Sequence, residues 1–349
     1  MPTDAPAAPI GLAFLGCGLA TRIHSKRLRG TRDVRRYYAS RDAARAAEYS
    51  RRFGGEGSFG SYEAALGDAR VTCALVATPP ATHLDLTLRA LAAGKDVIVE
   101  KPAFLRAADV DQVAAAAARA GRRVFVAENY HYKPIAAELR KLIAAGAFGD
   151  VRFVQVNALK HQPTPDWRAD PALAGGGALF EGGVHWVSFM ANLGLTVTAV
   201  RGARPRGTGD DAALERSMLA VFEYAEGAVG TLAHSWEIAS PLKGLRLSGI
   251  FGTRGSAVFE SNGLGLLVLG GRRRLALPGV RDFLGYGAMF RDFVDALRTG
   301  REPAMTLALA RRDLELVEEI YRTAGGEGPG ARSRELAGEF AGGPPQTST

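Results

Sequence analysis

Cysteine is scarce in this chain of 349 residues, which contains only Cys17 and Cys73. Two thiols are too few for a disulfide framework or for a cysteine-based metal cluster. The composition therefore excludes disulfide-held extracellular scaffolds and zinc-ribbon proteins. We expect no metal site, and we expect the protein to work in a reducing cytoplasm.

Long apolar runs are missing as well. No stretch of about 18 uninterrupted apolar residues occurs, although a membrane-spanning helix needs that length. The first nine residues also lack the basic and apolar regions of a signal peptide. We expect no membrane partner, and we expect residues 1–8 and the Gly- and Pro-containing residues 326–349 to form flexible tails.

Lysine contributes only 7 of the 44 basic residues, and the arginines that make up the rest are spread along the chain. The net charge of +8 suggests nucleic-acid binding, but no predicted helix carries a basic face. We attribute the charge to composition and expect no nucleic-acid partner. Nucleic-acid binding remains a rival hypothesis based on charge alone, and a gel shift with random DNA at several salt concentrations tests it.

Buried strands alternate with helices through the first third of the chain. This alternation predicts a parallel, doubly wound sheet. The expected strands are 10–15, 34–39, 71–78, 97–99 and 123–127, and the expected helices are 19–29, 43–52, 61–66, 83–93 and 107–120.

The pattern changes near residue 150, where alternating strands follow one another through short turns. The expected strands are 151–159, 197–202, 214–223, 228–236, 242–249, 256–260 and 264–269, with helices at 135–145, 289–298 and 307–323. The sequence thus predicts an α/β protein with a doubly wound domain over 9–130. A second α/β domain over 131–325 is expected to contain a large, mostly antiparallel open sheet.

A glycine turn follows the first expected strand. Its glycines permit a tight turn and let backbone N–H groups approach a pyrophosphate at a helix N-terminus. Thr21 replaces the third glycine of the usual dinucleotide fingerprint, so a turn without a ligand is the alternative. The candidate cofactor-binding residues here are Gly16, Cys17, Gly18, Leu19 and Ala20.

The second strand ends in Ser40, Arg41 and Asp42. A NAD site normally has an acid at this strand end to hold the ribose hydroxyls. Ser40 and Arg41 instead suit the 2′-phosphate of NADP, so NADP(H) is expected to bind in preference to NAD(H). As alternatives, Ser40 or Asp42 caps the next helix, or Asp42 takes the ribose and restores NAD preference.

The apolar strand 97–99 runs into Glu100, Lys101 and Pro102. Pro102 ends the strand, so Lys101 is expected at the carboxyl edge of a central strand, where open α/β sheets bind ligands. A solvated surface lysine is the alternative.

A glycine-rich stretch precedes Glu181 and His185. If a helix begins near residue 178, these two residues share a face and form a carboxylate–imidazole pair suited to proton transfer. An ordinary helix-surface pair is the alternative reading of this spacing.

Several of these motifs together resemble the glucose-fructose oxidoreductase, inositol dehydrogenase and rhizopine catabolism (Gfo/Idh/MocA) oxidoreductases, over nearly all of residues 9–325. The resemblance implies an N-terminal Rossmann domain and a C-terminal domain whose open sheet makes dimer or tetramer contacts. It is carried by Thr78, Pro79, Pro80 and His83, by the Gly94-Lys95 and Glu100-Lys101-Pro102 motifs, and by Trp167 and Arg168 before three glycines.

The resemblance also implies hydride transfer between a nicotinamide cofactor and a sugar or polyol carbon. Lys101 and His185 would be catalytic, and Glu181 would replace the usual Asp as the third member. Ser188 stands where relatives often have an acid, which leaves the substrate contacts open. Lys160, in an inserted stretch, and Tyr130 are the weaker candidates for substrate contact.

We therefore expect a NADP(H)-dependent oxidoreductase acting on a sugar, sugar derivative or cyclic polyol. The residues expected to bind the cofactor are Gly16, Cys17, Gly18, Leu19, Ala20, Ser40, Arg41, Thr78, Pro79, Pro80, His83, Glu100, Lys101, Trp167 and Arg168. A cofactor-binding sensor without turnover is the alternative, and a homodimer or homotetramer is the expected assembly.

Overall fold

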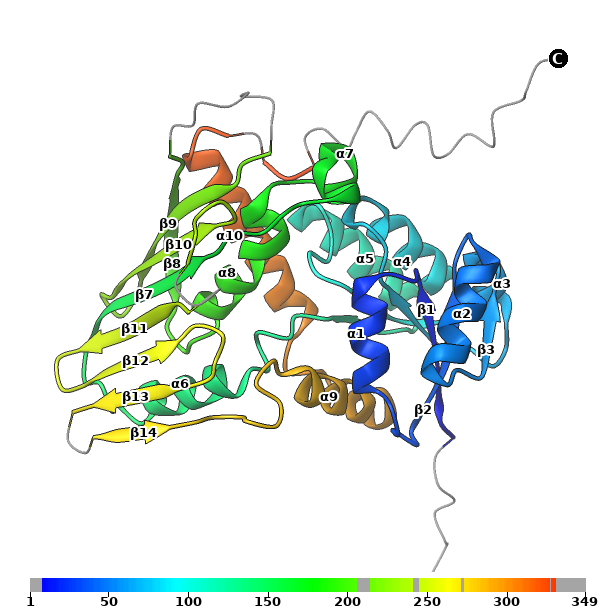
Figure 1. Ribbon diagram of the computed structural model, residues 1–349, viewed down its shortest axis with the longest axis horizontal. Helices are drawn as coiled ribbons and strands as arrows, with labels where there is room; N and C mark the ends of the chain where they lie inside the picture. Colours follow the sequence, from blue (N-terminus) through cyan, green and yellow to red (C-terminus); the bar gives the residue numbers. More distant parts are fainter. Residues whose placement is uncertain (1–7, 206–213, 241–244, 271–272, 327, 331–349) are drawn as a thin grey trace, which may run out of the picture.

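The first sheet is parallel throughout (Figure 1). The computed structural model describes residues 8–205, 214–240, 245–270, 273–326 and 328–330. The strand order is β3-β2-β1-β4-β5-β6, so the direction of winding reverses between β1 and β4, where such sheets bind ligands. The strands are β1 (Ile10–Leu15), β2 (Val34–Ala39), β3 (Gly57–Phe59), β4 (Cys73–Val76), β5 (Asp96–Val99) and β6 (Val124–Val126).

Helices cover both faces of this sheet, which confirms the predicted doubly wound fold. Buried residues of α1 and α2 pack with one face, and those of α3, α4 and α5 pack with the other. Strand β3 was not predicted, because three residues are too few to show a periodicity. The helices are α1 (Leu19–Arg27), α2 (Ala43–Phe53), α3 (Tyr62–Gly67), η1 (Pro80–Thr82), α4 (His83–Ala92) and α5 (Ala107–Ala120).

The second sheet is mostly antiparallel, as predicted. Its order is β14-β13-β12-β11-β7-β10-β9-β8, and only the β7–β10 pair in its described part is parallel. Residues 242–244 of one predicted strand lie outside the described residues, and that strand begins at Leu247. The strands are β7 (Val151–Leu159), β8 (Val197–Ala203), β9 (Ser217–Tyr224), β10 (Val229–Ser235), β11 (Leu247–Gly252), β12 (Ser256–Glu260), β13 (Leu266–Leu269) and β14 (Arg274–Ala276).

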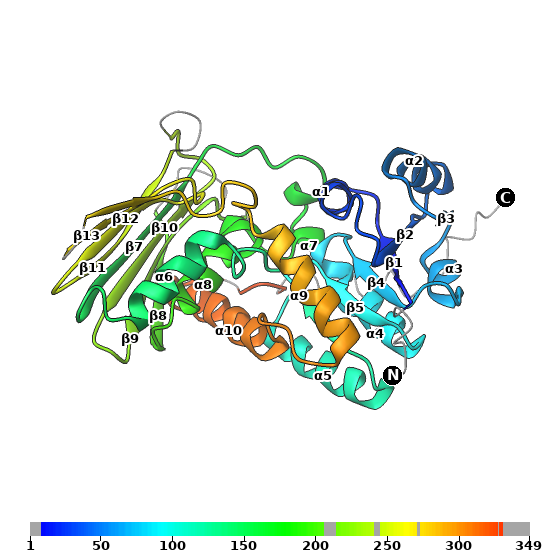
Figure 2. The same cartoon turned by 90° about the horizontal axis from the view of Figure 1, so that it is seen from below.

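Three helices pack on one face of the second sheet, and they are seen to its right in Figure 2. They are α6 (Pro134–Ala144), α8 (Val184–Ala191) and α10 (Leu307–Thr323). Between β7 and α8 the chain forms three short helical segments, η2 (Asp166–Ala169), α7 (Pro171–Ala174) and the π-helix η3 (Leu179–Gly183). The opposite face of the sheet carries no helix among the described residues and exposes apolar side chains.

Helix α9 (Tyr286–Thr299) returns from the second sheet to the first. Its Met289, Phe290 and Phe293 are buried in the same hydrophobic cluster as residues of β1, β4, β5 and β6. The Phe293 ring centroid lies 5.2 Å from that of Phe125 in β6. The first sheet ends with β6 and the second begins with β7 along the chain, but α9, which follows the second sheet, completes the core of the first.

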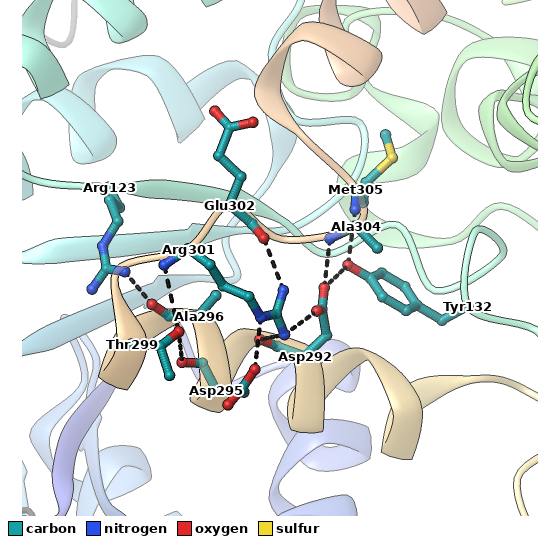
Figure 3. Close-up of polar contacts among 10 residues, drawn as sticks. All are labelled: Arg123, Tyr132, Asp292, Asp295, Ala296, Thr299, Arg301, Glu302, Ala304 and Met305. Carbon is teal, nitrogen blue, oxygen red and sulfur yellow. Dashed lines mark hydrogen bonds and ion pairs between the residues drawn. The ribbon is translucent and has the colours of Figure 1, made fainter.

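Polar contacts hold α9 in this position (Figure 3). Arg123, beside β6, donates to the carbonyl oxygens of Ala296 and Leu297, the latter at 2.7 Å. The Tyr132 hydroxyl donates to Asp292 Oδ2 at 2.6 Å. Arg301, just beyond the helix, forms ion pairs of 2.6 Å with Asp292 and with Asp295. Helix α9 is thus bonded to Arg123, which directly precedes β6, and to Tyr132 in the segment that follows β6.

Candidate active site

The turn after β1 requires glycine at its first position. Gly16 has φ +106°, and a Cβ there would lie 2.7 Å from the carbonyl oxygen of Ala77. Thr21, in the place of the usual third glycine, donates from its hydroxyl to the carbonyl oxygen of Gly16 at 2.6 Å. Thr21 therefore closes the turn from inside α1, and the missing glycine does not disrupt it.

The N-terminus of α1 fits the pyrophosphate of a dinucleotide. Gly18 caps the helix without a side-chain hydrogen bond, so N–H groups of the first turn, around Leu19 and Ala20, lack a capping side chain. No heavy atom lies within 4 Å of the position that a Gly18 Cβ would occupy. Free N–H groups, open space and the positive end of a helix dipole together form an anion site.

Asp42 at the end of β2 is occupied by the local structure. Its Oδ1 accepts from the backbone N–H of Arg45 at 3.1 Å and so caps α2, while the Ser40 hydroxyl accepts from the Asp42 N–H at 3.1 Å. Arg41 is exposed beside them. The Arg45 guanidinium donates to the carbonyl oxygen of Cys17 at 2.8 Å, which places a second arginine, not singled out in the sequence, at the glycine turn.

The buried His83 ring lies between two turns of the site. The ring is buried, with Nε2 2.9 Å from the carbonyl oxygen of Thr78 and Nδ1 2.9 Å from that of Pro102. Burial lowers the pKa of His83 below its ordinary value. Both ring nitrogens face protein carbonyls, so His83 positions the Thr78-Pro79-Pro80 turn and the Lys101–Pro102 turn.

Lys101 lies at the carboxyl end of β5, as predicted. Its Nζ donates to the backbone carbonyl oxygen of Glu181 at 3.0 Å, which joins the two halves of the site. The neighbouring Glu100 pairs with His24 of α1 and accepts from the Lys101 N–H at 3.1 Å. Burial alone would raise the pKa of Glu100, but the bonds to His24 and Lys101 outweigh it and lower the pKa. Glu100 thus holds the Lys101 backbone.

His185 is paired with Glu128, and the predicted Glu181–His185 pair is absent. The Nδ1 atom of His185 lies 2.7 Å from Oε1 of Glu128, which follows β6 and is almost fully buried. The ring of Tyr130 stacks on the imidazole at 4.2 Å between centroids, and its N–H donates to Glu128 Oε1 at 2.9 Å. Glu128 and Tyr130 together fix the orientation of the imidazole.

Glu181 turns toward Arg168 instead. Its Oε1 accepts from the Arg168 Nε at 3.0 Å. The prediction of a shared face assumed α-helical spacing, but residues 179–183 form a π-helix, whose wider turn changes the register before His185. Ser188, which stands where relatives often have an acid, is buried, and its hydroxyl lies 3.3 Å from the Asn192 side chain.

Glu128 could have been found from the sequence. It directly follows an apolar strand, as Lys101 does, and the carboxyl ends of parallel strands meet at one edge of the sheet. Burial raises the pKa of Glu128 to about 7. Burial, followed by the charge of Lys101, lowers the pKa of His185 well below its ordinary value, so its ring is neutral at neutral pH.

A cavity of about 230 Å³ lies beside this centre. Its lining includes Arg168, Glu181, Arg216 and Trp236. The Trp167 ring lies 4.4 Å from the guanidinium carbon of Arg168 and so supports the Arg168–Glu181 pair. Of the candidate substrate residues, Tyr130 stacks on His185, and the Lys160 Nζ lies 5.9 Å from the Trp236 ring centroid.

Neither a candidate membrane span nor a candidate metal cluster is found in the described part of the chain. Its helices include none with the length and apolar character of a membrane span. Within the same residues, no group of three or more His, Cys, Asp or Glu side chains is arranged to hold a metal ion.

The fold and site define an oxidoreductase with a dinucleotide-binding Rossmann domain and a second, sheet-based domain. Residues 10–128 match the oxidoreductase family with a NAD-binding Rossmann fold, and residues 136–258 match the GFO/IDH/MocA C-terminal domain. The chain belongs to the Gfo/Idh/MocA family of oxidoreductases.

Similar proteins agree with this assignment. Trans-1,2-dihydrobenzene-1,2-diol dehydrogenase of Mus musculus is 28% identical over 306 residues, which cover 82% of this chain and 87% of the relative. GenD2 from gentamicin A biosynthesis, solved in complex with NAD, is 28% identical with a TM-score of 0.80 over 93% of this chain and 97% of that one. Aldose-aldose oxidoreductase from Caulobacter crescentus, solved with glycerol, is 25% identical with a TM-score of 0.81 over 91% and 98%.

Proposed function

We propose that the protein is a NADP(H)-preferring oxidoreductase that transfers hydride between nicotinamide and a CH–OH carbon of a sugar, sugar derivative or cyclic polyol. The observation that carries this is that the Lys101 charge, at the carboxyl end of β5, acts on both members of the Glu128–His185 pair. A diol dehydrogenase and an aldose oxidoreductase among the similar proteins support this substrate class. The expected location is the cytoplasm.

The residues divide the chemistry between them. The Lys101 ammonium donates a hydrogen bond to the reacting oxygen and stabilises negative charge that develops there. With Nδ1 of His185 held by Glu128, Nε2 is left to take the hydroxyl proton during oxidation or to return it during reduction. The bound cofactor supplies the hydride acceptor or donor. The first turn of α1 would hold its pyrophosphate, and Arg41 its 2′-phosphate.

A substrate screen tests this function directly. Sugars, nucleotide-linked keto sugars and cyclic polyols are supplied with each cofactor while nicotinamide absorbance is followed. Hydride transfer with at least one hydroxylated substrate is expected. Tight cofactor binding without turnover on any of them would favour the sensor alternative.

Cofactor choice is tested at Arg41. We expect NADPH to bind at least about tenfold tighter than NADH, because a hydrogen bond to a charged group contributes roughly 1.5–3 kcal/mol. Arg41→Ala should remove most of this difference, and added salt should narrow it in the wild type. Fluorescence titration of both cofactors measures the effect. Arg51→Ala is the control, because Arg51 is an exposed arginine in the last turn of α2, the helix that follows Arg41. Equal affinities in the wild type would contradict the assignment.

The bare face of the second sheet is the proposed contact of a homodimer or homotetramer. Phe153 of β7, which pairs with the exposed Val229, is 53% exposed, and Leu247 of β11 is 57% exposed. Large exposed apolar areas mark interaction surfaces. The Phe153→Glu, Leu247→Glu double variant should dissociate to monomers in sedimentation equilibrium, whereas Val280→Glu, in the loop before α9, should not. A monomeric wild type would exclude this assembly.

A further inference from the structure

Several basic side chains surround the reaction centre, and most of them have partners within it. Arg168 pairs with Glu181 at 3.0 Å. The Lys133 ammonium lies 3.4 Å from the carbonyl oxygen of Ser261 and 4.1 Å from the Tyr130 ring centroid. The positive charges of Lys101, Lys133 and Lys160 all act on His185. The site thus contains basic groups in addition to Lys101.

Lys160 differs from the others because its ammonium is not bonded to an acceptor in the described part of the chain, although the charge of Glu181 acts on it. It follows β7, where its backbone N–H donates to the carbonyl oxygen of Ser235 at 2.9 Å. Within residues 8–205, 214–240, 245–270, 273–326 and 328–330, its Nζ has neither an ion pair nor a hydrogen bond. Its contact there is the ring of Trp236, 5.9 Å away. The side chain is half-buried, so this charge is costly to leave uncompensated.

Trp236, which lines the cavity, connects Lys160 to the wall of the active site. A Cβ on Gly182 would lie 2.7 Å from the Trp236 ring, so this ring packs directly on the backbone that follows Glu181. The carbonyl of Glu181 is the acceptor for Lys101. Burial, and then the charges of Arg246 and Lys101, lower the pKa of Lys160 to about 8, so the side chain is mostly cationic at neutral pH.

The same wall has a free acceptor for a hydroxyl group. Glu181 is 7% exposed and lines the cavity, and its Oε2 has no hydrogen-bond partner among the described residues. A buried carboxylate oxygen without a donor is rare in folded proteins and points to a donor supplied by a ligand. A ligand with both an anionic group and hydroxyl groups would satisfy Lys160 and Glu181 together.

Building on the proposed function, we propose that the substrate is a sugar acid or polyol acid whose carboxylate pairs with the Lys160 ammonium. A carboxylate fits better than a phosphate, because one flexible ammonium without backbone N–H groups or a free guanidinium fork matches a single negative charge. The hydroxyl groups of the same molecule would reach Glu181 and the Lys101–His185 centre.

The experiment compares acids with esters of the same shape. D-Glucuronate and D-galacturonate, each with its methyl ester, are the probes, and NADP⁺ reduction gives kcat/KM for each. The wild type should favour each acid by at least about tenfold, the scale of a hydrogen bond to a charged group. Lys160→Met should bring the acid-to-ester ratio close to one, and Lys160→Arg should keep part of it. Lys141→Met, an exposed lysine on α6, should leave the ratio at the wild-type value.

Melting temperature provides a second measurement, which does not depend on turnover. With NADPH bound, each acid should raise the melting temperature of the wild type more than its ester does, and Lys160→Met should abolish the difference. Neutral sugars oxidised as well as the acids would overturn this inference and leave the proposed function standing. An acid that is neither turned over nor bound better than its ester would also overturn it. Loss of all hydride transfer, neutral polyols included, would instead contradict the proposed function.

Discussion

Replacing Lys101 with methionine is expected to lower kcat by about two to four orders of magnitude, the usual scale for a group that assists proton transfer in the transition state. Methionine keeps an unbranched side chain but loses the ammonium that bonds to the Glu181 carbonyl and that, in the proposed mechanism, bonds to the reacting oxygen. Stopped-flow absorbance gives the rate, and cofactor fluorescence gives the affinity, which should change little because the glycine turn is untouched.

Two comparisons make the Lys101 result interpretable. Lys141→Met, far from the site, should retain the wild-type rate. Lys101→Arg should also have a lower kcat than the wild type, because a planar guanidinium does not replace the compact point charge of an ammonium. A Lys101→Met variant with a near-wild-type kcat would remove Lys101 from the catalytic centre.

His185→Ala should cause a loss of similar size, and Glu128→Gln a smaller one with a changed pH profile. Below about pH 7 the Glu128 carboxyl is protonated and donates to Nδ1 of His185, which leaves the proton of the neutral ring on Nε2. Above that pH the carboxylate accepts from Nδ1–H, and Nε2 becomes free to take a proton. The rate of substrate oxidation should therefore rise as the pH increases through about 7.

Glu128→Gln should abolish this rise, because the amide does not titrate. The measurement is kcat/KM for oxidation between pH 5.5 and 9, a range chosen to bracket the pKa of about 7. Glu181→Gln serves as the matched control, since its carboxylate contacts Arg168, and it should keep the rise. If Glu181→Gln abolished the rise and Glu128→Gln kept it, the sequence-based choice of Glu181 would be correct.

Much of this architecture was predictable because strands and helices of a doubly wound sheet leave strong local signals. The apolar run before Lys101 and the glycines after β1 each show their role within a few residues. Glu128 left a comparable signal at the end of its apolar strand, but its pairing with His185 did not, since the two residues are 57 positions apart along the chain. Helical spacing pointed to Glu181, and a π-helix, which has no simple sequence signature, changed the outcome.

The position of α9 was beyond local reasoning for a related reason. Its amphipathic pattern predicts a helix with one buried face, but it does not say which sheet that face will cover. The contact between Phe293 and Phe125 joins residues that are far apart along the chain. Only the three-dimensional path, with Arg123 bonded to the end of the helix, assigns α9 to the first sheet.

This return of the chain has a consequence for synthesis on the ribosome. When the last strand of the first sheet has been made, the helix that covers Phe125 is still more than 150 residues from being translated. Domains generally fold as units as they emerge, but here the nucleotide-binding half must wait, with part of its core open to water, until nearly the whole polypeptide is available. Truncation upstream of residue 286 would remove the cover of this core and favour aggregation.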